Sequence, residues 1–218
     1  RWGLSFVVDD DILFDAFGDA QVFTDNVRRF AVDVNRFKQV VISHEHWDHI
    51  EGLRLLLKQR PGLPVYLPQH ADSALKDKIR LWGGDVKEVV ASMKIKEGVF
   101  TSGELIGQYA GKDMPEQALV LETARGLVVV AGCAHPGIVT IVRRVQDIFH
   151  QPIYGVVGGF HLKDHAPDEM SLEVANLKAA GITMAAPLHC TGAYAEKIFQ
   201  QVFGADCVLF AEGQEITL

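Results

Sequence analysis

The run His44-Glu45-His46-Trp47-Asp48-His49 constrains this chain more than any other part of its sequence. It places three imidazoles and the Asp48 carboxylate within six residues. The preceding run, Gln39 to Ser43, is compact and rich in β-branched residues, which predicts a buried strand with the histidines at its C-terminal end. A single structural role for so many imidazoles in so short a turn is hard to imagine. The run therefore predicts a metal site. It is not the helical zinc-protease pattern, which needs histidines four apart around a glutamate.

Three further predicted strands end in metal-binding residues, at Cys133 to His135, at His161 and at His189. Side chains at the C-terminal ends of core strands can converge on one cleft. These residues exceed the usual four ligands of one ion, which suggests two metal ions. Imidazole selects metals less sharply than thiolate does. We therefore expect one or two Zn²⁺ ions as the simplest occupant, with iron or manganese as alternatives.

The rest of the chain alternates between strand and helix patterns. Strands are predicted as a hairpin over Gly3 to Phe14 and at 39–43, 65–67, several places between 86 and 106, 119–121, 127–130, 156–157, 182–188 and 207–210. Helices are predicted at 22–30, from Leu53 to Pro61, and at 71–82, 138–149, 170–180 and 193–203. This order predicts an α/β sandwich with mixed sheets inside and helices outside.

Length and charge narrow the function classes. The 218 residues suit one domain of roughly 200–250 residues, spanning 1–218. A formal charge of -7 argues against bulk attraction to nucleic acid or anionic lipid. Neither an apolar run of about 18 residues nor a leader pattern is visible, so we expect no membrane span. The three cysteines, Cys133, Cys190 and Cys207, form no Cys-x-x-Cys pair, which favours a reducing cytoplasm over a disulfide framework.

The motifs also resemble a known family. Ser43 to His49, followed by Gly52-Leu53, resembles the signature loop of the metallo-β-lactamase superfamily. The later motifs are similar to the branch named after dihydropterin-ribofuranosylaminobenzene phosphate synthase of methanopterin biosynthesis; they are Gly132-Cys133-Ala134-His135-Pro136-Gly137-Ile138, Gly158-Gly159-Phe160-His161-Leu162 and Pro187-Leu188-His189-Cys190-Thr191-Gly192. The resemblance implies the αββα sandwich of that superfamily, with two mixed β-sheets flanked by helices. It also implies an extra strand before Trp2, whose loss would expose an edge and invite a homo-oligomer.

The resemblance implies a role for each matching residue. His44 and His46 would bind the first metal, and Asp48, His49 and His189 the second. Asp15 would orient a ligand histidine from behind, which fixes its tautomer; a plain strand-end turn residue is the alternative.

The chain departs from the superfamily pattern at two places. No histidine lies between His70 and His135, where most members have a ligand, and Cys133 stands where a bridging aspartate is usual. His135 is the natural replacement ligand. Cys133 is a candidate thiolate ligand, although a small buried cysteine is the plainer interpretation. His161 is a candidate ligand or proton-transfer group, with an ordinary hydrogen-bonded histidine as the alternative.

The remaining candidates receive no metal role. We expect His70, His150 and His165 to be ordinary surface or loop histidines. Cys190 follows a predicted ligand, but adjacent strand residues point to opposite faces, so we expect it to pack away from the metal. We expect Trp47 to line the mouth of the pocket.

The favoured function is a metal-dependent hydrolase acting on a small-molecule substrate, with Asp48 and His161 as catalytic residues. Asp48 would also hold the second metal and accept hydrogen bonds from the nucleophile, and His161 would protonate the leaving group. One alternative is the synthase of the branch name, which needs an aromatic slot and a phosphate anchor; the candidate parts are Trp47, Phe160, Lys163 and Lys112. Another is a non-catalytic metal-bound ligand sensor.

Overall fold

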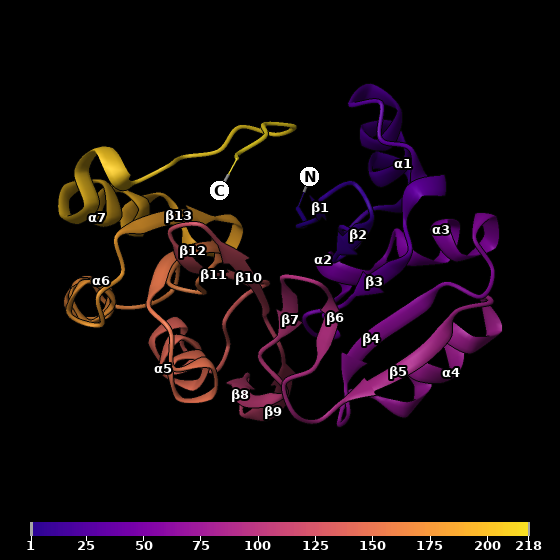
Figure 1. Cartoon of the computed structure of the whole chain (residues 1–218), viewed down its shortest axis with the longest axis horizontal. Helices are drawn as coiled ribbons and strands as arrows, with labels where there is room; N and C mark the ends of the chain where they lie inside the picture. Colours follow the sequence, from indigo (N-terminus) through magenta and orange to yellow (C-terminus); the bar gives the residue numbers. More distant parts are fainter. Residues whose placement is uncertain (1, 218) are drawn as a thin grey trace. The chain divides into compact units, whose positions relative to one another are not determined.

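The computed structural model describes residues 2–217. The chain divides into two compact units, Arg1–Val90 and Ala91–Leu218. Figure 1 traces the elements of both along the sequence. Each unit has a sheet, helices and a hydrophobic core of its own. The single domain predicted for residues 1–218 stays a prediction.

Unit 1 contains a five-stranded mixed sheet in the order β1-β2-β3-β4-β5. Its strands are β1 (Phe6–Val8), β2 (Ile12–Phe14), β3 (Gln39–Val41), β4 (Pro64–Pro68) and β5 (Asp85–Val89). The β1–β2 pair is the predicted antiparallel hairpin, and its turn is tightened by left-handed Asp9 and Asp10. The other neighbours pair in parallel, so β2 and β3 both end at the same edge of the sheet. The histidine run that predicted a metal site follows β3 at that edge.

The helices of unit 1 cover its core. They are α1 (Ala20–Arg29), the short α2 (Trp47–Ile50), α3 (Leu53–Gln59) and α4 (Ser73–Leu81), with a 3₁₀ turn η1 (Val34–Arg36) before β3. Leu53, Leu56 and Leu57 recur at helical spacing in α3 and are buried with the alternating β4 residues Val65 and Leu67. Burying each such side chain stabilises the fold by about 1.5–3 kcal/mol.

Unit 2 contains a six-stranded mixed sheet in the order β13-β12-β11-β10-β7-β6. Its strands are β6 (Lys94–Lys96), β7 (Val99–Thr101), β10 (Leu119–Thr123), β11 (Gly126–Ala131), β12 (Ile153–Gly159) and β13 (Met184–Leu188). The central strands β11, β12 and β13 run in parallel, so their carboxyl ends share one edge. Three of the predicted site segments begin there.

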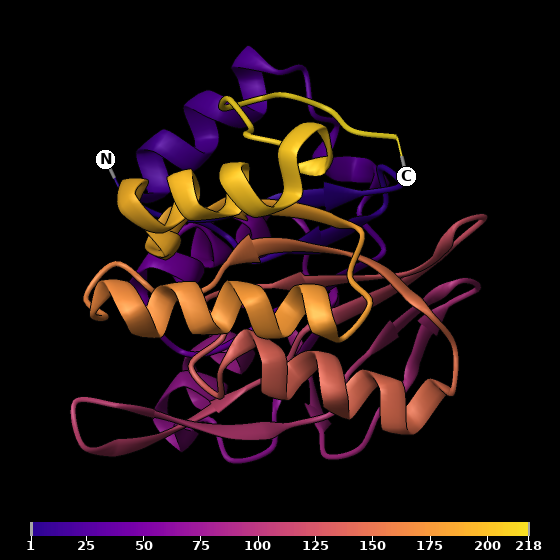
Figure 2. The ribbon, with the colours of Figure 1, turned by 90° about the vertical axis from the view of Figure 1, so that its left-hand side faces the viewer.

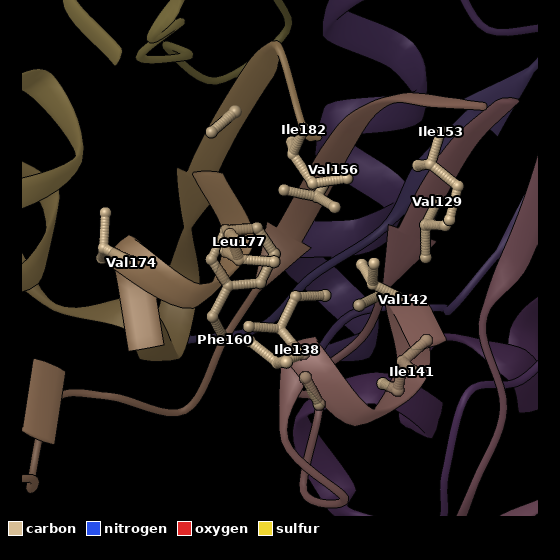
Figure 3. Packing of buried hydrophobic residues seen from close by; sticks show 14 of the residues in the cluster. Val129, Ile138, Ile141, Val142, Ile153, Val156, Phe160, Val174, Leu177 and Ile182 are labelled. Atoms are coloured by element: carbon tan, nitrogen blue, oxygen red, sulfur yellow. The ribbon is translucent and has the colours of Figure 1, made fainter. Parts of the chain in front are cut away.

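Three helices lie side by side on one face of this sheet, as Figure 2 shows: α5 (Ile138–Phe149), α6 (Pro167–Ala179) and α7 (Ala193–Phe203). Helix α5 buries Ile138, Ile141, Val142 and Val145, the i, i+3, i+4, i+7 pattern of one apolar face. These side chains meet residues from the strands and from α6 in one cluster; Figure 3 labels Val129, Val156, Phe160, Val174 and Leu177 among them. The cluster fixes α5, and with it the turn that connects β11 to α5.

A separate two-stranded hairpin completes unit 2. It consists of β8 (Leu105–Tyr109) and β9 (Lys112–Glu116), which pair antiparallel through a turn at Ala110 and Gly111. Gly107 of β8 packs closely on the chain just beyond β11. A methyl group at Gly107 would lie 2.5 Å from the His135 carbonyl carbon and 2.6 Å from the Pro136 nitrogen. The hairpin is therefore seated directly on a predicted site segment.

The element order confirms the predicted α/β class of mixed sheets flanked by helices. The predicted bounds of α5 and α7 agree with the structure. The predicted closing strand at 207–210 is wrong, because between α7 and residue 217 the chain makes an isolated bridge, Ala185 to Cys207, in place of a strand. A 3₁₀ turn, η3 (Gly204–Asp206), precedes it. No helix within residues 2–217 is long and apolar enough to cross a membrane.

Candidate metal centre

Four of the predicted ligands come together in unit 1. The chain leaves β3 through Ser43 and forms a tight turn into α2. His44 and His49 are fully buried, Asp48 is 7% exposed and His46 is half-buried. Nε2 of His44 lies 3.1 Å from Nδ1 of His46, and the ring centroids of His44 and His49 are 4.2 Å apart. Nε2 of His49 lies 3.8 Å from Oδ2 of Asp48. Such a concentration of imidazoles and carboxylate in a buried turn fits a cation.

The Asp15 carboxylate stabilises this turn through contacts with Ser43 and His49. Asp15 directly follows β2, is fully buried, and its Oδ1 accepts the backbone N–H of Ser43 at 2.7 Å. Its Oδ2 accepts the Ser43 hydroxyl at 2.7 Å and lies 2.6 Å from Nδ1 of His49. This is the contact with a histidine that the family resemblance implied for Asp15.

Ser43 extends this support to a second histidine. The Ser43 hydroxyl has one hydrogen, and it donates that hydrogen to Asp15. Its oxygen lies 2.8 Å from Nδ1 of His44, so the His44 Nδ1–H must donate to Ser43. His49 likewise donates from Nδ1 to the Asp15 carboxylate. In both rings the lone pair is therefore on Nε2. Sequence reasoning assigned no role to Ser43, although its place directly before the first histidine was a usable signal.

Unit 2 gathers its candidate residues at the carboxyl ends of β11, β12 and β13. Cys133 and His135 follow β11, His161 follows β12, and His189 begins the 3₁₀ turn η2 (His189–Thr191) after β13. The ring centroids of His135 and His161 are 4.6 Å apart. Tyr109 at the end of β8 makes edge contacts with both rings, with centroids 5.5 Å from His135 and 5.7 Å from His161. Tyr109 was not predicted, because nothing in the sequence places β8 beside these histidines.

A buried glutamate supports His135. Glu116, at the end of β9, accepts the backbone N–H groups of Cys133, Ala134 and His135 at 3.0, 2.7 and 2.8 Å. Its Oε2 also lies 2.8 Å from Nδ1 of His135. Complete burial raises the pKa of Glu116, but the hydrogen bonds from His135 and the backbone outweigh burial and hold that pKa below its usual value. Sequence reasoning missed this residue.

Two thiols lie beside His161. Sγ of Cys133, a ring nitrogen of His161 and Sγ of Cys190, which could bind a metal ion, all lie within 4.8 Å of one another. The backbone N–H of His161 donates to Sγ of Cys190 at 3.2 Å. Burial opposes ionisation of the Cys190 thiol, but hydrogen bonds with Cys133 and His161 and the charge of His189 outweigh it, lowering the pKa of Cys190 to about 5. In turn, Cys190 raises the pKa of His161 against the opposing effect of burial.

The residues at these strand ends share an unusual backbone conformation. Asp15, Ala134, His161 and His189 have φ angles of 59°, 57°, 48° and 52°. A left-handed conformation costs a non-glycine residue about 1–2 kcal/mol. Backbone strain of this kind concentrates at ligand-binding and catalytic sites. The strain thus supports a functional role for the strand ends of each unit.

Comparison with known proteins places the chain among its relatives. A family model described as a β-lactamase superfamily domain matches residues 10–104. The crystal structure of Tm1679, described as a metal-dependent hydrolase of the β-lactamase superfamily, aligns with 100% of this chain and 92% of its own, at 29% identity and a TM-score of 0.83. The chain is therefore similar in sequence and in fold to proteins of the β-lactamase superfamily.

Two curated relatives come from Methanocaldococcus jannaschii. One is named 7,8-dihydropterin-6-methyl-4-(β-D-ribofuranosyl)-aminobenzene-5'-phosphate synthase and is 27% identical over 251 residues, covering 94% of this chain and 85% of the relative. The other is an uncharacterized protein, 26% identical over 208 residues, covering 83% of this chain and 79% of the relative. The similarity to the synthase agrees with the branch that the later motifs indicated.

The structure corrects two sequence expectations. Cys190 was expected to pack away from the metal because of strand alternation, but its Sγ lies with Cys133 and His161 in a group that could hold an ion. The chain leaves β13 at Leu188, so strand alternation no longer applies in η2. Phe160 was a candidate for an aromatic slot, but it is 2% exposed and packs on Phe199 at a centroid distance of 5.3 Å. Phe160 belongs to the core of unit 2.

The other sequence candidates lie at the surface. His70, His150 and His165 are exposed, in keeping with their prediction as ordinary histidines. Trp47 is 55% exposed, and Lys112 is exposed near the tip of the β8–β9 hairpin. None of these residues is part of the buried histidine groups.

Proposed function

We propose that the chain is a metal-dependent hydrolase with one or two zinc ions. The proposed ligands are His44, His46, Asp48, His49, His135 and His189. The observation that carries the proposal is the arrangement around Asp15 and Ser43, which assigns the lone pairs of His44 and His49 to Nε2. A histidine that binds a metal usually donates the N–H of its other ring nitrogen to a hydrogen-bond acceptor such as a carboxylate. The 29% identity to a structure described as a metal-dependent hydrolase supports the same reaction class.

The chain's own residues would divide the work of hydrolysis. When bound, the metal would lower the pKa of a water molecule and polarise an ester, lactone or phosphoester oxygen. Asp48, almost buried, would accept a hydrogen bond from the attacking water. His161, half-buried beside Tyr109, would protonate the leaving group. Asp15 and Ser43 would hold the rings of His44 and His49 in place.

Metal content is the first test. Protein prepared without chelator should contain one or two transition-metal ions per chain by elemental analysis, and the His44→Ala/His46→Ala variant should contain fewer while remaining folded. A chain that stays empty after incubation with zinc, iron and manganese contradicts the proposal.

The replacement ligand is tested by single variants. His135→Ala should lower metal occupancy as much as His46→Ala does. Unchanged occupancy in His135→Ala would instead assign the place to His161 or Cys133, and titrations of His161→Ala and Cys133→Ala decide between them. His150→Ala, at an exposed histidine, is the matched control.

Activity is tested with metal-loaded protein against phosphodiester, lactone, thioester and β-lactam probes. Turnover that disappears in His49→Ala supports the hydrolase. If the metal-loaded protein hydrolyses none of these probes, the result contradicts the proposed hydrolase function.

The synthase is the second candidate, favoured by the 27% identity to the methanogen relative over 94% of this chain. That reaction would need an aromatic surface and a phosphate anchor. With Phe160 in the core, the remaining candidates are Trp47, Lys112 and Lys163, which is 45% exposed. Quenching of pterin fluorescence by the protein, with no hydrolysis of any probe, would favour this function. Absence of both signals, with metal bound, would favour a ligand sensor.

A further inference from the structure

The Glu116 carboxylate is enclosed by hydrogen-bond donors from a single short segment. Oε1 accepts the N–H groups of Cys133 and Ala134, and Oε2 accepts the N–H of His135. The fourth contact, at 2.8 Å, joins Oε2 to Nδ1 of His135. Glu116 is fully buried, so no solvent competes for these positions. Three consecutive backbone N–H groups directed at one anion form a nest of the kind that binds phosphates elsewhere. Here the anion is the chain's own side chain.

The hydrogen bonds around Glu116 determine which ring nitrogen of His135 carries the proton. Backbone N–H groups can only donate, and a carboxylate that accepts on both oxygens has no hydrogen to give. Nδ1 of His135 is therefore the donor to Glu116, and the lone pair of the neutral ring lies on Nε2. We infer that Glu116 is a positioning residue for His135: it orders the turn after β11 and selects the tautomer in which Nε2 can bind a metal.

The β8–β9 hairpin holds Glu116 in this role. Glu116 ends β9, while Gly107, on the paired strand β8, packs against the backbone of His135 and Pro136. The turn is thus held by a side chain from one strand and by backbone contact with the other. An equivalent arrangement occurs in unit 1, where Asp15 accepts from Ser43 and His49. In both units a buried carboxylate accepts from the backbone and lies within hydrogen-bond distance of a histidine Nδ1, that of His135 in unit 2 and that of His49 in unit 1.

The inference rests on the proposed function in one respect, the metal-binding role of His135. The test uses Glu116→Gln, because glutamine keeps the shape but has one acceptor oxygen, and its NH₂ group would face two of the four donors. Metal affinity of the full chain, measured by competition with a chromogenic zinc chelator, should fall about 10–100-fold. Glu122→Gln, at an exposed glutamate on β10, should leave affinity unchanged.

Two further measurements separate positioning from general stability. In a His135→Ala background, Glu116→Gln should cause no additional loss of affinity, whereas in a His46→Ala background the full loss should remain. Independent losses in both backgrounds would overturn the inference.

The tautomer is read directly from ¹⁵N chemical shifts of the His135 ring in metal-free wild-type protein, which requires no variant to fold. A ring protonated on Nδ1 supports the inference, and a ring protonated on Nε2 overturns it. If His135→Ala leaves metal affinity unchanged, the proposed ligand role of His135 fails, and the tautomer still decides what Glu116 does.

Discussion

The Ser43 hydroxyl oxygen lies 2.8 Å from Nδ1 of His44. Because the same hydroxyl donates to the Asp15 carboxylate, it connects the His44 ring to Asp15. Ser43→Ala removes this relay and leaves one acceptor position of the buried Asp15 without its donor. We expect zinc affinity to fall about tenfold, because supporting hydrogen bonds of this kind typically contribute 10–100-fold. Competition titration with a zinc chelator measures the change.

The control for Ser43 is Ser73→Ala, at an exposed serine in the same unit. If both serine variants bind zinc as wild type does, the His44 tautomer does not depend on the hydroxyl.

Asp15→Asn should act on His49 and Ser43 together. An asparagine has one acceptor oxygen where the carboxylate accepts on both, so at least one buried donor loses its partner. We expect metal affinity to fall about 10–100-fold. Metal-free protein should also lose about 1–3 kcal/mol of unfolding free energy. Chelator competition and urea denaturation measure the two effects, with Asp10→Asn at the exposed hairpin turn as control. A loss of stability with full metal affinity would assign Asp15 to the fold alone.

Gly159→Ala tests how tightly the end of β12 is packed. An added methyl group would lie 2.4 Å from the carbonyl oxygen of Gly132, 2.7 Å from Sγ of Cys190 and 3.3 Å from Cδ2 of His189. Because the first of these neighbours is backbone, the strands must separate, and we expect a loss of about 1–3 kcal/mol. Denaturant titration of metal-free protein measures it, and unchanged stability would mean that η2 shifts without cost.

The pH dependence of stability should depend on Glu88. The hydrogen bond and charge of nearby Lys76, whose Nζ lies 2.9 Å from Oε1, hold the pKa of Glu88 below its ordinary value. A depressed pKa contributes stability above the ordinary glutamate value of about 4.3, and this is lost as pH falls through the lower folded-state value. Glu88→Gln should therefore lower the Tm at neutral pH, and the difference from wild type should shrink below about pH 4.

Thermal scans across this pH range test the prediction, with Glu51→Gln at another exposed glutamate as control. A difference between Glu88→Gln and wild type that is the same in acid and at neutral pH would rule out the ion pair as its source.

The candidate residues that the structure brings together in unit 1 could be picked out from the sequence because the information there is local. Within a few residues, the β-branched run of β3 gives the strand and the histidine run gives the donors. Asp15 is distant in sequence, but β2 and β3 are parallel neighbours, and both lead to the same edge. The resemblance to a known family, and not this topology, supplied the expected role of Asp15, and the shared edge explains why the carboxylate reaches His49 in α2.

Glu116 could not be found in this way. It lies 19 residues before His135, and its segment, Lys112 to Glu116, includes a proline and lacks strand alternation. Its role arises only when β9 pairs with β8 and the hairpin packs on the turn after β11. Cys190 was mispredicted for a related reason, because alternation was extended two residues beyond Leu188, where β13 ends. The candidate site residues lie at strand ends, and beyond a strand end the alternation of side chains no longer predicts which way a residue points.

The left-handed backbone at the strand ends sets a limit on how this protein can adapt to heat. Glycine at Asp15, Ala134, His161 or His189 would relieve about 1–2 kcal/mol of strain at each position. At Asp15, His161 and His189, the substitution would also remove a polar side chain of the candidate centre, so the protein would gain stability but lose part of the site. At Ala134, glycine would relieve the backbone strain without removing a polar side chain of the site. A lineage moving to higher temperature could change that alanine without cost to the site, and beyond it would have to find stability in the cores of the two units.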